Sequence, residues 1–254
     1  IKHAQREIQR QADAAIKGSI IRAIVELITN ADDSYKVLEK SGINHTGKII
    51  IEYCRDKARG FVRVMDVAQG MYQDKMVEVM DIGVEGSANY SDTDIDVRGL
   101  FGHGLKDAIM GLGKATITSI RDGIINVFTV FDDKGWEFKF DSEEKKATKS
   151  ELDECEIPYA KPGGLKPHGT IVYIKLNKDI KRPLFSTIKD NIKNHFELRT
   201  IIGNKNREVI IREITLNKTG KRRVKKEERL NYNAPVGNVI HDDIHKTKNT
   251  KKSF

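Results

Sequence analysis

The stretch ATITSIRDGIINVFTVFDDKGWEFKF, residues 115–140, carries the clearest fold signal in the chain. Its apolar residues are mostly β-branched or aromatic, and many of them alternate with polar residues, as they do in half-buried strands. Asp122-Gly123 and residues 132–135 interrupt this pattern at two places where tight turns are expected. The stretch therefore predicts three consecutive antiparallel strands joined as a meander.

Upstream of the meander, the first forty residues have the periodicity of a helix. Apolar side chains recur on one helical face at Ile20, Ile24, Leu27, Ile28 and Ala31. Gly42 is expected to end this helix. The following segments predict strands at 47–55 and 61–66, a helix at 71–80 and a long polar loop at 81–98.

The remaining segments mix helices with further strands. They predict a short helix at 104–113, a charged surface connection at 142–151, a strand at 170–176, a helix at 183–196 and one or two strands at 207–216. Helices combined with antiparallel strands in this order predict an α+β fold built as a two-layer α/β sandwich.

The overall composition is that of a globular protein. The chain has 254 residues, a formal net charge of +8, 38% hydrophobic residues and 32% charged residues. No apolar run approaches the roughly 18 to 20 residues of a membrane-spanning helix, so we expect no membrane partner. The two cysteines, Cys54 and Cys155, form no paired motif, which favours a reducing compartment: the cytoplasm, or the nucleus in a eukaryote. Because IKHAQREIQR opens the chain without Met or a signal core, we expect a longer parent protein.

The basic excess is concentrated near the end of the sequence. Residues 219–254 hold ten Lys/Arg and four Asp/Glu, a net charge of +6. The interpretation is a main domain at 1–180, a helix-and-strand extension at 181–218, and a basic tail or linker toward a missing domain at 219–254. Composition favours a solvated linker, and a nucleic-acid contact through this tail is the alternative.

Polar residues share one side of the first helix. Glu26 and Asn30 are four residues apart in ELITNADDS and therefore project from the same side, with Asp33 extending the line. Taken alone, this pattern also fits an ordinary solvated face.

Two further signals lie at the ends of strands. Asp66 ends the strand VRVMD ahead of Gly70, where a carboxylate could accept a hydrogen bond from a ligand amine, although an ordinary turn fits equally well. GLFGHGL places Gly99, Gly102 and Gly104 before a helix, an arrangement whose backbone N–H groups can hold phosphate.

Read together and in order, these segments resemble the GHKL superfamily of ATP-binding domains, named for gyrase, the ninety-kilodalton heat-shock chaperone, histidine kinases and MutL. ELITNAD is similar to the family's N-box, DVAQGM to its D-x-G-x-G box, GLFGHGL to its G-x-x-G-x-G box and HGT to its late Gly-Thr. The resemblance covers roughly residues 15 to 176 and is nearest to MORC-type and related prokaryotic ATPases. It implies the Bergerat sandwich, with helices on one face of a mixed, mainly antiparallel sheet.

The resemblance also implies a role for each matched residue. Glu26 corresponds to the catalytic general base, Asn30 to the Mg²⁺ ligand, Asp66 to the acceptor of the adenine amine and Thr170 to its supporting hydroxyl. The implied ATP-binding set also contains Asp33, Gly70, Met71, Gly99, Leu100, Phe101, Gly102, His103, Gly104, Leu105 and Lys106. Of these, His103 is interpreted as a spacer and Lys106 as a residue of the helix surface that could add a charge to a phosphate.

The expected function is therefore Mg²⁺-dependent ATP binding and hydrolysis. The state of the bound nucleotide, ATP or ADP, is expected to drive closure of a lid at residues 81–98 and ATP-dependent homodimerisation of a larger protein. Ala68 replaces the first glycine of the D-x-G-x-G box, which would cost about 1 kcal/mol if this position needs a positive φ. The residues after Leu176 are too few for the transducer domain that completes the site in hydrolysing relatives. The alternatives are a nucleotide sensor without hydrolysis and a basic nucleic-acid-binding protein.

Overall fold

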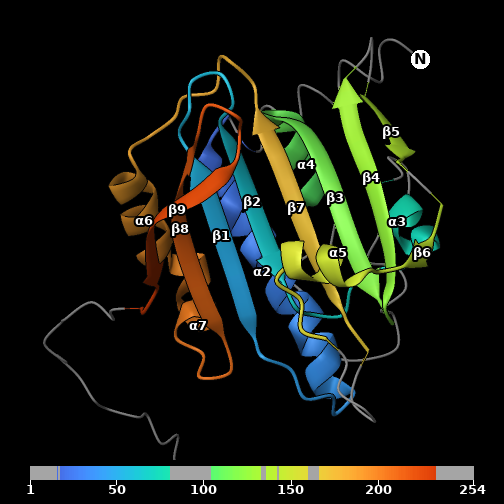
Figure 1. Ribbon diagram of the computed structural model, residues 1–254. Helices are drawn as coiled ribbons and strands as arrows, with labels where there is room; N and C mark the ends of the chain where they lie inside the picture. Colours follow the sequence, from blue (N-terminus) through green and yellow to red (C-terminus); the bar gives the residue numbers. More distant parts are fainter. Residues whose placement is uncertain are drawn as a thin grey trace, which may run out of the picture.

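The computed structural model describes residues 16, 18–80, 104–132, 136–141, 143–159 and 166–232. Within these residues nine strands form one sheet, ordered β5-β4-β3-β7-β2-β1-β8-β9, with β6 beside β4 (Figure 1). The strands are β1 (Lys48–Cys54), β2 (Phe61–Asp66), β3 (Gly113–Arg121), β4 (Ile124–Asp132), β5 (Trp136–Phe140), β6 (Lys145–Lys146), β7 (Gly169–Leu176), β8 (Glu208–Leu216) and β9 (Arg222–Arg229).

The main helices cover one face of this sheet, behind the strands in Figure 1. They are α2 (Ile20–Lys40), α3 (Gln73–Met80), α4 (Gly104–Leu112), α6 (Phe185–Lys193) and α7 (Arg199–Ile202), with a 3₁₀ turn at Phe196–Leu198. The predicted α+β, two-layer fold is therefore confirmed. None of the described helices is long and apolar enough to cross a membrane.

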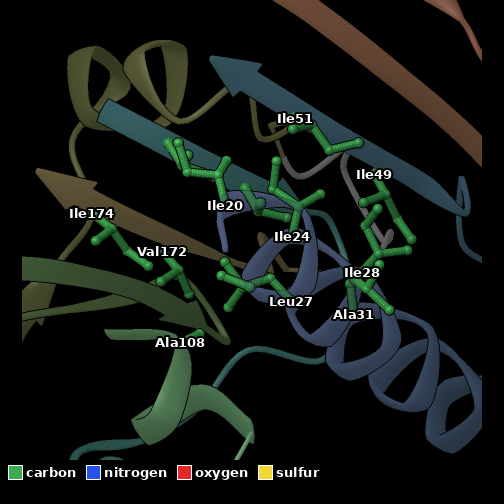
Figure 2. Packing of buried hydrophobic residues seen from close by; sticks show 14 of the residues in the cluster. Ile20, Ile24, Leu27, Ile28, Ala31, Ile49, Ile51, Ala108, Val172 and Ile174 are labelled. Carbon is green, nitrogen blue, oxygen red and sulfur yellow. The ribbon is translucent and has the colours of Figure 1, made fainter. Parts of the chain in front are cut away.

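Helix α2 forms because its sequence supplies both a cap and an apolar stripe. The side chain of Ser19 accepts a hydrogen bond from the Arg22 backbone N–H, which satisfies one free donor at the helix start. The predicted stripe is buried against the sheet and α4, as Figure 2 shows for Leu27 and Ala108. Gly42 follows the helix with φ of 69°, a conformation that favours glycine, so the predicted stop is confirmed.

The meander is also confirmed. Strands β3, β4 and β5 pair antiparallel in succession, and Asp122 and Gly123 both have positive φ, as a two-residue hairpin turn requires. The sheet has one parallel pair, β1 with β8, in register from Lys48 opposite Glu208 to Cys54 opposite Ile214.

A short helix lies on the opposite face, in front of the sheet in Figure 1. Helix α5 (Lys149–Glu154) begins inside the segment predicted to be only a charged surface connection, so that interpretation is wrong at its end. The cause is a capping box between Thr148 and Glu151 that starts a helical turn. Leu152 then packs against Ile50 and neighbouring residues of the sheet face.

The predicted division of the chain also needs correction. Strand β8 lies between β1 and β9, so the sheet continues across the boundaries predicted at 180 and 218. Residues 222–229 are a paired edge strand and not part of a linker, and Leu230 is buried. Charge patterning missed this strand because its residues are exposed and its stability comes from backbone pairing to β8. Residues 233–254 lie outside the described part, and nucleic-acid binding by this segment stays a prediction.

Candidate functional site

Helix α2 presents its predicted polar residues beside α4. Glu26 and Asn30 are both half-buried on this helix. A Cβ atom added to Gly104, the first residue of α4, would overlap Oε2 of Glu26. The Glu26 carboxylate therefore lies directly against the start of α4, and a side chain at position 104 would require it to move.

The surroundings of Glu26 favour its protonated form. Burial raises the pKa of the Glu26 carboxyl, and the negative charges of Glu197 and Asp107 raise it further. A carboxyl group with a raised pKa holds a proton more readily once it accepts one, which is the property of a general base.

Two neighbouring charged residues, Asp33 and Lys106, are buried and so do not form a solvated helix face. Asp33 is buried, and its Oδ1 accepts a hydrogen bond of 2.8 Å from Lys36 Nζ. Its predicted contact with a nucleotide stays a prediction. Lys106 is only 3% exposed, so the interpretation that it lies on the helix surface is wrong. Position 106 lies on the side of α4 that packs into the protein, which the short GLK segment did not reveal.

The second group of predicted residues gathers where β2 ends and β7 begins. Asp66 pairs with Thr170 across these antiparallel strands. The backbone N–H of Ala68 donates to Oδ1 of Asp66 at 2.9 Å, and the Thr170 backbone also hydrogen-bonds to this carboxylate. Burial outweighs both hydrogen bonds and raises the pKa of Asp66 to about 7. This carboxyl group can therefore change its charge near neutral pH.

The loop after Asp66 is held against β3. The backbone N–H of Met71 donates to Ser119 Oγ at 2.7 Å, and this hydroxyl lies 3.4 Å from Thr170 Oγ1. Gly70 has φ of 66°, and a Cβ atom there would overlap the carbonyl oxygen of Ile120. Glycine is therefore required at position 70 both for its backbone angle and for space.

Ala68 does not carry the strain expected for it. Among the described residues, the non-glycine residues with positive φ are Asp122 and Glu156, so Ala68 occupies an ordinary region. Its side chain is fully buried in the core. The expected cost of about 1 kcal/mol does not arise, because the left-handed conformation in this loop belongs to Gly70.

Three residues that hold the loop after β2 were not identified by the sequence analysis. Tyr35 accepts a hydrogen bond from the Val67 backbone N–H at 2.9 Å, Ser34 accepts one from the Gln69 N–H at 3.1 Å, and Ser119 holds Met71. Ser119 could have been recognised from the sequence, because it takes an inward position in ATITSIR, where the alternation predicts an apolar residue. Ser34 and Tyr35 could not, because only the folded chain brings α2 beside this loop.

The structure thus assembles two groups along α2. One contains Glu26 and Gly104, and the other contains Asp66, Gly70, Met71 and Thr170; the hydrogen bonds from Ser34 and Tyr35 join the second group to α2. Leu105 packs against the hydrophobic core. The predicted residues Gly99, Leu100, Phe101, Gly102 and His103 lie outside the described residues, as does the predicted lid at 81–98.

Within the described ranges, no group of three or more His, Cys, Asp or Glu side chains could hold a metal ion. Comparison of the chain with models of protein families and with curated proteins finds no match. The assembled residues are therefore the basis on which a function can be proposed.

Proposed function

We propose that this chain binds ATP with Mg²⁺ and hydrolyses it as a GHKL-type domain of a larger protein. The observation that carries this proposal is the position of Asp66, a carboxyl group at the end of β2 whose Oδ1 accepts the Ala68 N–H at 2.9 Å. It lies opposite Thr170 on the neighbouring strand. Gly70, which has no Cβ atom, lets the loop after β2 approach the backbone of β3 closely. A carboxylate acceptor next to a hydroxyl suits the amine and ring nitrogen of adenine.

The phosphate end of the proposed site lies along α2 and α4. The start of α4 offers backbone N–H groups, which favour anions at a helix N-terminus. Asn30 supplies an amide oxygen of the hard type that Mg²⁺ prefers, and this ion often takes only one or two protein ligands besides water and phosphate. Bound Mg²⁺ would neutralise phosphate charge. The residues present fit such an ion without a cluster of carboxylates.

Glu26 is the proposed general base. Its carboxylate would orient a water molecule and accept the proton that this water loses as it attacks the terminal phosphate. The raised pKa of Glu26 favours holding this proton. Coupling of turnover to lid closure and to formation of an ATP-dependent homodimer is part of the same proposal.

Binding is tested by calorimetric titration with a non-hydrolysable ATP analogue, with and without Mg²⁺. We expect Mg²⁺-dependent binding that Asp66→Asn weakens by about tenfold or more, since the amide no longer supplies a charged acceptor. Asp190→Asn is the matched control, because Asp190 is an exposed acid on α6. Equal affinity of the parent and Asp66→Asn would refute the adenine assignment.

Hydrolysis is tested separately, by phosphate release in the longest available form of the protein. Glu26→Gln should keep analogue binding and reduce turnover by at least about a hundredfold, as for loss of a general base. Binding with no turnover in either protein would instead favour the nucleotide-sensor alternative.

A further inference from the structure

A groove of about 670 Å³ lies on the open face of the sheet, opposite α2 and α4. Helix α5, in front of the sheet in Figure 1, borders it on one side, and the end of the β8–β9 hairpin borders it on the other. Its volume falls within the range of about 300 to 1,000 Å³ typical of small-molecule sites. The proposed nucleotide site faces the other layer, so this groove is a separate feature.

The floor of the groove is flat and mostly apolar. Thr118 pairs with Val127 of β4 on one side and with Ile171 of β7 on the other, so these three side chains form one row across the sheet. Thr116 and Tyr173 pair in the next row. Strands lie about 4.8 Å apart, so a three-strand floor is about 10 Å wide, comparable to a fused pair of aromatic rings.

One end of the groove is basic, whereas the side formed by α5 carries Glu151 and Glu154. Arg59, Lys175 and Arg222 line the basic end, and Arg63 lies buried beneath. The arginines are already paired: Arg222 binds Glu52 Oε2 at 3.2 Å, Arg63 binds the same oxygen at 3.1 Å, and Arg59 lies 3.6 Å from Asp56.

Lys175 differs from these arginines, because it has no ion pair with any described residue. It is exposed and lies two residues beyond Tyr173 on β7. Its ammonium group is therefore the cation available to a ligand at this end.

The chemistry of the lining side chains suits ligand binding better than a covalent reaction. Cys155 is the cysteine among its lining residues, and burial raises the pKa of this thiol to about 11. A thiol with such a pKa stays protonated and is a poor nucleophile at neutral pH.

We propose that this groove binds a small amphipathic anion, whose flat apolar body lies over Val127, Ile171 and Tyr173 and whose acidic group meets Lys175. The threonine hydroxyls at 116 and 118 offer hydrogen bonds to polar atoms on the body. The site is independent of nucleotide binding on the opposite layer.

The probe for this proposal is 1-anilinonaphthalene-8-sulfonate, a flat aromatic anion, titrated by its fluorescence against the whole chain. Lys175→Glu should weaken its binding by about tenfold or more, because an attractive charge becomes repulsive. Lys40→Glu is the charge-matched control: Lys40 is exposed at the end of α2, and this variant should bind within twofold of the parent.

A second variant tests the floor without changing charge. Thr118→Trp places a large ring on a half-exposed strand position and should reduce probe binding by a similar factor while the thermal transition is retained. Probe affinities within twofold of the parent for both groove variants would overturn the proposal. Displacement of the probe by the non-hydrolysable ATP analogue would also overturn it, since the probe would then occupy the other layer.

Discussion

Gly70 brings the loop after β2 against the backbone of β3. Its φ of 66° and the position of the Ile120 carbonyl oxygen are two separate reasons for glycine. Gly42 shares the first reason only: its φ is 69°, but nothing lies within 4 Å of an added Cβ atom. The two glycines therefore separate the cost of the backbone angle from the cost of crowding.

We expect Gly42→Ala to lower the free energy of unfolding by about 1 kcal/mol, the cost of a left-handed alanine. Gly70→Ala should lower it by about 2 to 4 kcal/mol, because overpacking adds to the same strain. Urea unfolding of both variants measures the difference. Equal losses would mean that the loop moves away from Ile120 without cost.

Asp66 makes a second prediction at this scale. Its pKa is about 7 in the folded protein, above the value near 3.9 of an unfolded aspartate, so the folded state binds the proton more tightly. Stability from this group is complete below about pH 4 and is lost as pH rises through 7. The slope has an upper limit of about 1.4 kcal/mol per pH unit within this window.

Asp66→Asn should remove this part of the pH dependence, whereas Asp190→Asn should retain it. Urea midpoints at several pH values between 4.5 and 8 provide the measurement. A parent protein and an Asp66→Asn variant with parallel profiles would show that Asp66 titrates as an ordinary exposed aspartate.

At the scale of elements, one arginine ties β8 to α2. Arg207 precedes β8, and its fully buried guanidinium donates to Asp32 Oδ1 at 2.7 Å and to both oxygens of Glu39. It also lies over the Tyr35 ring, with its Cζ atom 5.0 Å from the ring centroid. This contact positions the helix that carries the candidate site relative to the sheet.

Arg207→Met should therefore destabilise the fold by about 2 to 4 kcal/mol, because the buried Asp32 carboxylate then keeps only Lys36, whose Nζ lies 3.1 Å from its Oδ2, and Glu39 loses its arginine partner. Arg229→Met removes an exposed pair with Glu208 at 3.7 Å and should change stability by less than about 1 kcal/mol. Thermal or urea unfolding distinguishes them; similar losses would mean that the buried pair contributes no more than a surface pair.

Strand β9 gives the second prediction for an element. A chain ending at residue 232 keeps the contacts of β9 with the other described residues, including Leu230 N–H to Val209 O at 2.8 Å. A chain ending at residue 218 loses the strand and exposes β8 as an unpaired edge, which favours aggregation. We expect the first to unfold cooperatively like the parent and the second to be strongly destabilised or insoluble, as judged by size-exclusion chromatography and urea unfolding.

At the scale of the whole molecule, the sequence predicts those elements that are determined by residues close together in the chain. The α2 stripe and the β3–β5 meander follow from periodicity and turn residues within short windows. The position of β8 beside β1 does not, because the partner of each β8 residue lies 160 residues earlier, as for Glu208 and Lys48, and strand pairing over that distance leaves no local pattern.

The residues of the candidate site also fall into two classes, those that stand in local motifs and those that only the fold brings together. Glu26, Asp66 and Thr170 stand in ordered motifs that could be recognised from the sequence. The hydrogen bonds of Ser34, Tyr35 and Ser119 arise only when distant elements meet, and the burial of Lys106 depends on how α4 packs. The sequence thus indicates chemical groups, while the fold determines which of them are held in place.

The parallel pairing of β1 with β8 has a consequence for the order of synthesis. Strands β1 and β2 leave the ribosome early, but the neighbour of β1 on its other side is made only after residue 208. Until then, one edge of β1 lacks its final partner, and contacts of such long sequence separation slow folding. We therefore expect the nascent chain to depend on chaperones that shield strand edges, and ribosome-bound chains stopped before residue 208 to stay sensitive to protease.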